Sequence, residues 1–293
     1  MRAKRQIKAE NEKKKHSGKV KKEKGKKNNG MKSRILNFII LAVLFLGIVL
    51  MAYPAISNLL NERNQSKSIS NYDHVLKDMS AEEKAKMWDE AVKYNQDLAH
   101  GIQGNNYNDI LNVTGTGIMG YVKIPKIHLE LPIYHGTSEG VLRTGVGHLE
   151  NTSFPTGGKG THCAISGHTG LPSSKMFTNV EKLKKGDMFI LKSVDHTMTY
   201  QVDQIKVVLP DETKDLEIDP NKDYCTLITC TPYGVNSHRL LIRGIRTANI
   251  IPEPNIGKID VIAITMLVFA GILLVVFIKE VKNLRKKRRK KLE

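Results

Sequence analysis

The chain has 293 residues, of which 46 are Lys or Arg and 29 are Asp or Glu, giving a net charge of +17. So basic a composition suits a nucleic-acid-binding protein, but the distribution of the charge excludes that class. Residues 1–34 hold 15 basic and 3 acidic side chains and residues 279–293 hold 9 and 2, which leaves the 22 basic and 24 acidic side chains of residues 35–278 close to balance.

Each basic tail adjoins an uncharged apolar run. The runs are residues 35–53, followed by Pro54, and residues 261–278. A helix of about 20 apolar residues crosses a bilayer, so we expect a transmembrane helix at each run, the first ending at Pro54. A cleaved signal peptide is the alternative for the first run, but the run is long for one and no clear small-x-small cleavage site follows it.

The charge asymmetry predicts the topology. Basic segments beside membrane spans stay on the cytoplasmic side and contact anionic lipids. We therefore expect a two-pass protein of the cell membrane, with both termini cytoplasmic and the body extracellular.

Residues 54–116 are expected to form an extracellular stalk and an N-terminal helix. Residues 58–78 are polar and predict an irregular stalk. Ser80 and Glu83 then form a capping box, which predicts a helix to about Leu98. Residues 100–116 are rich in Gly and Asn and predict a loop.

From residue 117 the sequence changes to short strands separated by turns. About eight strands at this spacing predict a closed β-barrel over residues 117–250, with one short helix at 177–183 and a linker at 251–260. The strand segments singled out are 121–124, 129–134, 161–166, 188–192, 199–209, 224–229 and 239–245. The sequence has no paired CxxC, no HExxH and no phosphate-binding Gly loop, so we expect neither a metal ion nor a cofactor.

Cys230 ends one predicted strand, and Arg239 begins the next after a turn rich in Pro, Gly and Asn. The hairpin predicts a thiol beside a guanidinium. A thiolate next to a fixed positive charge is a good nucleophile at neutral pH. Taken alone, however, a Cys at a strand end is more often a small buried hydrophobe.

A proton carrier is also needed, because Arg is not deprotonated in proteins. His168 follows a predicted buried strand and lies in a glycine-rich turn, which keeps its ring accessible. His135 and His148 also adjoin glycines and are competing candidates. His238 directly precedes Arg239, but neighbouring strand residues point to opposite faces, so His238 should point away from the Cys230–Arg239 face.

These residues resemble a known family. Thr226-Leu227-Ile228-Thr229-Cys230 followed by Arg239 resembles the sortase signature, and Ser166-Gly167-His168 resembles the sortase histidine region. Further blocks resemble class C, the pilin-polymerising sortases, as does the second membrane helix. These blocks are Ile124-Pro125-Lys126-Ile127, Leu131-Pro132-Ile133-Tyr134-His135-Gly136-Thr137, Gly145-Val146-Gly147-His148-Leu149, Gly170-Leu171-Pro172 and Thr229-Cys230-Thr231-Pro232-Tyr233-Gly234.

The resemblance implies a mainly β fold, an eight-stranded sortase-type barrel with short helices and two flanking transmembrane helices. It also implies a cysteine transpeptidase of the Gram-positive cell surface. Cys230 would attack the Thr carbonyl of an LPxTG-like sorting signal, His168 would carry the proton, and Arg239 would stabilise the substrate carbonyl and its oxyanion. The partners implied are LPxTG-bearing pilins or surface proteins, with a pilin lysine as the acceptor.

Three other functions remain as alternatives. A housekeeping-type sortase would anchor proteins to the cell wall, but the second membrane helix and the Thr-Pro after Cys230 argue against it. A membrane-bound cysteine peptidase would pair its His with Asn or Asp, whereas the third member here is Arg. An adhesin would not need a free Cys beside an Arg.

Two details stay open in the sequence. Class C enzymes usually carry an Asp-Pro-aromatic lid motif ahead of the barrel, and no such motif occurs here. Residues 100–109, with Tyr107, lie in its place, so we expect a weak lid or none.

Cys163 and Cys225 each lie five residues before a candidate catalytic residue, on strands that are neighbours in a sortase barrel. Two buried thiols are favoured over a disulfide, because side-by-side strand positions rarely suit disulfide geometry.

Overall fold

The computed structural model describes residues 2–102, 104–250, 265, 268–272, 274–279 and 281–282, with the backbone alone for residues 2–34. The chain divides into two compact units: Pro54–Ile259, and Met1–Tyr53 together with Asp260–Glu293. The helices are α1 (Arg2–Asp78), α2 (Ala81–Ala99) and α3 (Glu139–Thr144), with short 3-10 turns η1 (Pro125–Ile127), η2 (Val180–Lys182) and η3 (Lys214–Leu216). The strands are β1 (Ile118–Ile124), β2 (Leu129–His135), β3 (Val146–His148), β4 (Thr161–Ser166), β5 (Met188–Ser193), β6 (His196–Val208), β7 (Asp223–Thr231) and β8 (His238–Thr247).

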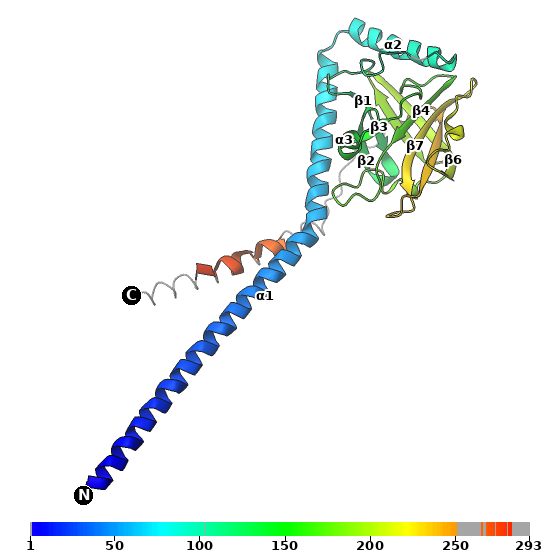
Figure 1. Cartoon of the computed structure of the whole chain (residues 1–293). Coiled ribbons are helices and arrows are strands. Elements are labelled where there is room, and N and C mark those ends of the chain that lie inside the picture. The colour runs from blue at the N-terminus through cyan, green and yellow to red at the C-terminus, as the bar shows by residue number, and fades with distance from the viewer. Residues whose placement is uncertain are drawn as a thin grey trace. The chain divides into compact units, whose positions relative to one another are not determined.

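The eight strands close into a barrel in the order β1-β2-β3-β4-β7-β8-β6-β5 (Figure 1), which confirms the predicted fold. Most pairs are antiparallel, but β2–β3 and β4–β7 are parallel. Inward-facing side chains alternate with outward-facing ones along each strand and fill the barrel. Ile165, Phe189, Leu227 and Ile242 are completely buried there, and burying each such side chain contributes about 1.5–3 kcal/mol.

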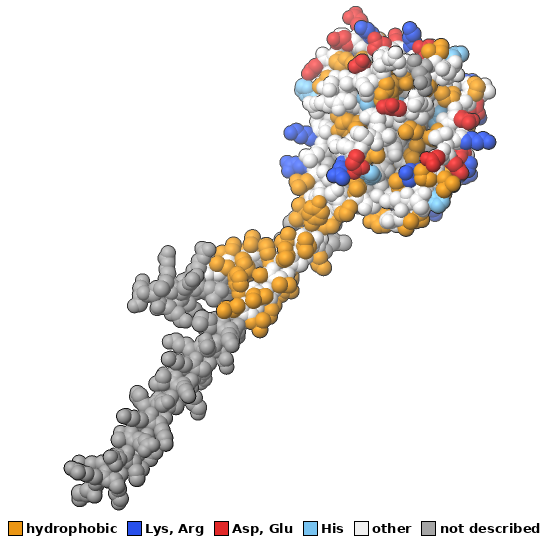
Figure 2. Space-filling view, in the orientation of Figure 1, with side chains coloured by type: hydrophobic (Ala, Val, Ile, Leu, Met, Phe, Trp, Pro, Cys, Tyr) orange, Lys and Arg blue, Asp and Glu red, His pale blue; other side chains and the backbone are white. Residues whose placement is uncertain are grey.

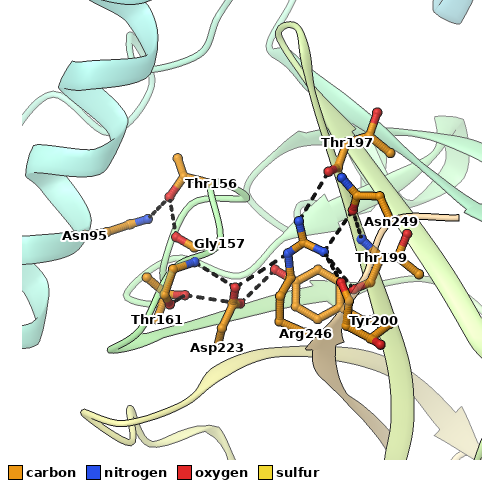
Figure 3. A network of polar contacts seen from close by, with 12 residues as sticks. Asn95, Thr156, Gly157, Thr161, Thr197, Thr199, Tyr200, Asp223, Arg246 and Asn249 are labelled. Carbon is orange, nitrogen blue, oxygen red and sulfur yellow. Dashed lines mark hydrogen bonds and ion pairs between the residues drawn. The ribbon is translucent and has the colours of Figure 1, made fainter.

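A polar network surrounds Asp223, at the start of β7 (Figure 3). Its carboxylate accepts hydrogen bonds from the Tyr200 hydroxyl (2.9 Å) and the Gly158 amide (2.7 Å), and Arg246 lies 3.7 Å away. Burial raises the pKa of Asp223. Cys230 is at the other end of the same strand, so this network supports the barrel away from the thiol.

Helix α2 begins as predicted. Ser80 Oγ accepts a hydrogen bond from the Glu83 amide (3.2 Å), and the Glu83 carboxylate accepts one from the Ser80 amide (2.8 Å). Asn95 then fixes the helix to the barrel by donating to Phe154 O (3.1 Å) and Thr156 Oγ1 (2.8 Å).

Two predictions about the segment before α2 are wrong. Pro54 does not end the first helix, and residues 58–78 are not irregular, because α1 continues to Asp78. A proline inside a helix costs about 3 kcal/mol or more, but Ile69, Tyr72 and Leu76 recur at three- and four-residue spacing and are buried. Figure 1 shows this part of α1 running beside the barrel. These three side chains form an apolar stripe along the helix, and their packing stabilises it. The stripe is easily overlooked because the segment is mostly polar.

The other unit contains the apolar part of α1. Among the described residues, α1 from residue 35 onward is the one helix long and apolar enough to cross a membrane. Orange side chains cover this stretch in Figure 2, whereas the surface of the barrel unit carries charges of both signs.

The second predicted span, residues 261–278, is described in part. Residues 261–264, 266–267 and 273 lie outside the described residues, as do the predicted linker from residue 251 on and most of the C-terminal tail. A shorter apolar helix covers Val268–Lys279. Within this unit the Phe277 ring stacks on Phe38 and Phe45, with centroids 5.1 and 6.1 Å apart.

Candidate functional site

Cys230 and Arg239 face each other across the β7–β8 hairpin. They are direct partners in the antiparallel register, which puts their Cβ atoms on one face about 5 Å apart. Cys230 is a free, half-buried thiol. The Arg239 Nη1 donates to the carbonyls of Asn236 (3.3 Å) and His238 (3.2 Å), so the turn holds the guanidinium at the start of β8. The register therefore places Cys230 and Arg239 opposite each other on neighbouring strands, as the hairpin predicts.

His168 comes to the same place through the parallel β4–β7 pairing. Beyond the end of β4, the Gly167 amide donates to Ile228 O (3.0 Å) and Thr229 Oγ1 donates to Gly167 O (2.8 Å). The chain therefore leaves β4 beside the residue that precedes Cys230. A Cβ at position 167 would lie 2.7 Å from the Phe177 ring, so glycine is required for this close approach.

The His168 ring has a partner that the sequence did not reveal. Its Nε2 lies 3.3 Å from Oε2 of Glu139, in the first turn of α3. The other carboxylate oxygen of Glu139 accepts a hydrogen bond from Arg143 Nε (2.7 Å). The Arg143 bond and, next, His168 hold the pKa of Glu139 below its usual value. This carboxylate can orient the imidazole.

The competing histidines have structural contacts instead. The two ring nitrogens of His135 lie 2.9 Å from Gly117 O and 2.7 Å from Ile110 O, and burial lowers the pKa of this residue. His148 is fully buried, with Nε2 2.9 Å from Ser153 O. The structure thus brings His168, and neither of these two, to the end of β7.

The arrangement can carry out acyl transfer through a cysteine. The thiol can attack a carbonyl carbon, the guanidinium can stabilise the resulting oxyanion, and the imidazole can move a proton. Among the described residues, no cluster of three or more His, Cys, Asp or Glu side chains could hold a metal ion.

Comparisons with known proteins agree with this chemistry. The family described as "Sortase domain" matches residues 122–247. Sortase C1 of Streptococcus agalactiae is 46% identical, with a TM-score of 0.61 over 63% of this chain and 100% of that one. The chain belongs to the sortase family. Sortases are cysteine transpeptidases.

Two further sortases extend the comparison. A structure of Clostridium perfringens sortase C with the C-terminal cell wall sorting motif is 46% identical, with a TM-score of 0.59 over 63% of this chain and 100% of that one. Sortase A of Bacillus anthracis is 27% identical over 73% of this chain and 95% of its own length. The structural neighbours from S. agalactiae and C. perfringens are both class C sortases.

In this sortase the loop before the barrel is anchored through Tyr107. The Tyr107 hydroxyl accepts a hydrogen bond from the Gly136 amide (2.9 Å) and lies 2.9 Å from His148 Nδ1. The ring stacks on Phe154, and burial raises the pKa of Tyr107. Tyr107 therefore packs on the side of the barrel formed by β2 and β3.

Cys163 and Cys225 are neighbours in the parallel β4–β7 register, as the resemblance implied. Both are free and buried in the core of the sortase barrel. Burial raises the pKa of the Cys225 thiol. They act here as small core side chains, and Cys230 is the accessible thiol of the three.

Proposed function

We propose that this protein is a class C sortase that cleaves an LPxTG-like sorting signal at Thr and joins it to an amine, a pilin lysine, to polymerise pili. The proposal is supported mainly by the meeting of Cys230, Arg239 and His168 at one end of the barrel. The likeness to class C structures, one of them bound to a sorting motif, supports the substrate class.

The first half of the reaction forms an acyl-enzyme. The Cys230 thiolate attacks the Thr carbonyl carbon, and Arg239 stabilises the oxyanion. When the oxyanion collapses, the Thr–Gly amide bond breaks, and His168 gives its proton to the departing amine. A thioester on Cys230 remains.

The second half transfers the acyl group. The lysine amine loses a proton to His168 and attacks the thioester carbon, and collapse expels the Cys230 thiolate. One amide bond has broken and one isopeptide bond has formed, so neither an oxidant nor a cofactor is required.

We further propose a two-pass anchor with the catalytic barrel outside the cell. The apolar part of α1 and the Phe contacts to the C-terminal apolar helix support this. Tethering raises the effective concentration of a membrane-anchored substrate. The proposed parts are cytoplasmic tails at 1–34 and 279–293, spans at 35–53 and 261–278, an N-terminal region at 54–116, a barrel at 117–250 and a linker at 251–260.

Mass spectrometry of reaction products tests the proposal. The full chain in detergent is incubated with an LPETG peptide and a lysine-bearing acceptor peptide. A product ending at Thr and linked to the lysine amine is expected. Hydrolysis alone would favour the peptidase, and exclusive transfer to a cell-wall-type amine would favour the housekeeping alternative.

A further inference from the structure

The face of α1 that lies against the barrel changes character along its length. Beyond residue 66 it is apolar, as described for Ile69, Tyr72 and Leu76. Toward the N-terminus the same stripe continues at three- and four-residue spacing as Asn58, Asn61 and Gln65. Gln65 is only 5% exposed. Polar side chains are kept at such positions when they are hydrogen-bonded.

The three amides bond to two segments of the barrel unit. Asn61 Nδ2 donates to Ser173 O (2.8 Å), and Asn58 Oδ1 accepts from the Lys175 amide (2.9 Å). Gln65 Nε2 donates to Thr144 O (3.2 Å), at the last residue of α3, and lies 3.4 Å from Met176 Sδ. One helix face thus binds both α3 and the loop 173–176.

Both segments act on His168. Helix α3 carries Glu139, which contacts the His168 ring. The loop after His168 folds back so that the Phe177 amide donates to His168 O (2.9 Å), and Thr178 Oγ1 accepts from the Gly170 amide (3.1 Å). Residues 167–179 form turns without helix or strand, so bonds from outside the loop limit its local opening.

We propose that Asn58, Asn61 and Gln65 form an amide clamp that positions His168 for proton transfer. The clamp rests on the proposed function, because it presumes that His168 carries the proton. Proton transfer requires hydrogen-bond reach, and a displacement of about 1 Å can reduce a rate about 100-fold. The clamp residues are positioning residues that do not touch the substrate.

The test compares the variant Asn61→Leu/Gln65→Met with the wild type, as full chains in detergent. Both changes remove amide donors and keep the side-chain size. Asn64→Leu is the matched control, because it makes the same change at an exposed position of α1. The readouts are kcat and KM with an LPETG peptide and a lysine acceptor, normalised to titratable Cys230, and hydrogen–deuterium exchange of residues 168–178.

The clamp predicts a kcat at least tenfold lower, a KM within about twofold of the wild type and faster exchange in the loop; the control should match the wild type. A kcat within twofold of the wild type per titrated site would overturn the clamp, even if the variant were less stable. If the double variant fails to fold, Asn61→Leu alone is judged by the same criteria. Failure of the proposed function is distinguishable, because wild type and Cys230→Ala would then be equally inactive.

Discussion

Cys230 is half-buried at a strand end, so its side chain can be removed with little cost to the barrel. We predict that Cys230→Ala abolishes transpeptidation while destabilising the fold by roughly 1 kcal/mol. Cys163→Ala and Cys225→Ala should stay active because both thiols are buried in the core. Product mass spectrometry and thermal melts measure the two effects. Covalent product from Cys230→Ala would show that the nucleophile is another residue.

Substitutions of Arg239 show whether oxyanion stabilisation needs only its positive charge or also the geometry of its guanidinium donors. We predict that Arg239→Lys is nearly as damaging as Arg239→Ala, with a loss of about 100- to 1,000-fold in kcat, as for the removal of one oxyanion donor. Lys keeps the charge but lacks the planar fork of donors. Steady-state kinetics of both variants, with Cys230 titrated as a control, decides this. Near-normal turnover in the Lys variant would rule out the proposed oxyanion geometry.

Residue identities and turn signals were sufficient to predict the Cys230–Arg239 pair, because a short hairpin determines its own register. They were not sufficient to predict the contact between Glu139 and His168. Helix α3, which carries Glu139, has six residues, too few for periodicity to show, and the contact with His168 spans 29 positions of the chain.

At the scale of elements, the question is whether the loop with Tyr107 acts as a lid over Cys230 in the resting enzyme or leaves the thiol accessible. The Tyr107 hydroxyl contacts Gly136, which directly follows β2, and His148, the last residue of β3. We therefore predict that iodoacetamide labels Cys230 quickly in the resting wild type. Deletion of residues 101–109 should raise the labelling rate less than about twofold.

The control for this deletion is Tyr107→Phe, which removes the hydroxyl contacts and keeps the ring. It should lower stability, by about 1–3 kcal/mol for the partners left unpaired, and leave the labelling rate unchanged. A large increase in labelling on deletion would identify this loop as a working lid.

Predictions at the element scale succeeded where strands were long enough to show a pattern. β4 was predicted with its observed bounds, whereas β3 was missed because its three residues include a glycine. The extension of α1 past Pro54 was missed for another reason. Its apolar side chains stabilise the helix only when they pack against the barrel, and the sequence of the segment alone does not show that packing.

At the scale of the whole molecule, the barrel unit has its own core and should not require the membrane segments. We predict that a chain from Pro54 to Asp260 is soluble and turns over peptide with a kcat within about threefold of the full chain. This chain keeps Asn58, Asn61 and Gln65. Gel filtration, circular dichroism and peptide kinetics test it, with the full chain in detergent as the control. A folded but inactive product would mean that the removed segments do more than anchor.

The parallel pairing of β4 with β7 also governs when activity can first arise. The bond between Thr229 and Gly167 joins positions 62 residues apart, and the intervening chain must form β5 and β6. Closing so long a loop has an entropic cost that local hairpins avoid, and non-local pairing of this kind forms slowly. In a newly made chain Cys230 and His168 are therefore far apart, and the chain becomes active only when the barrel has closed and brought them together.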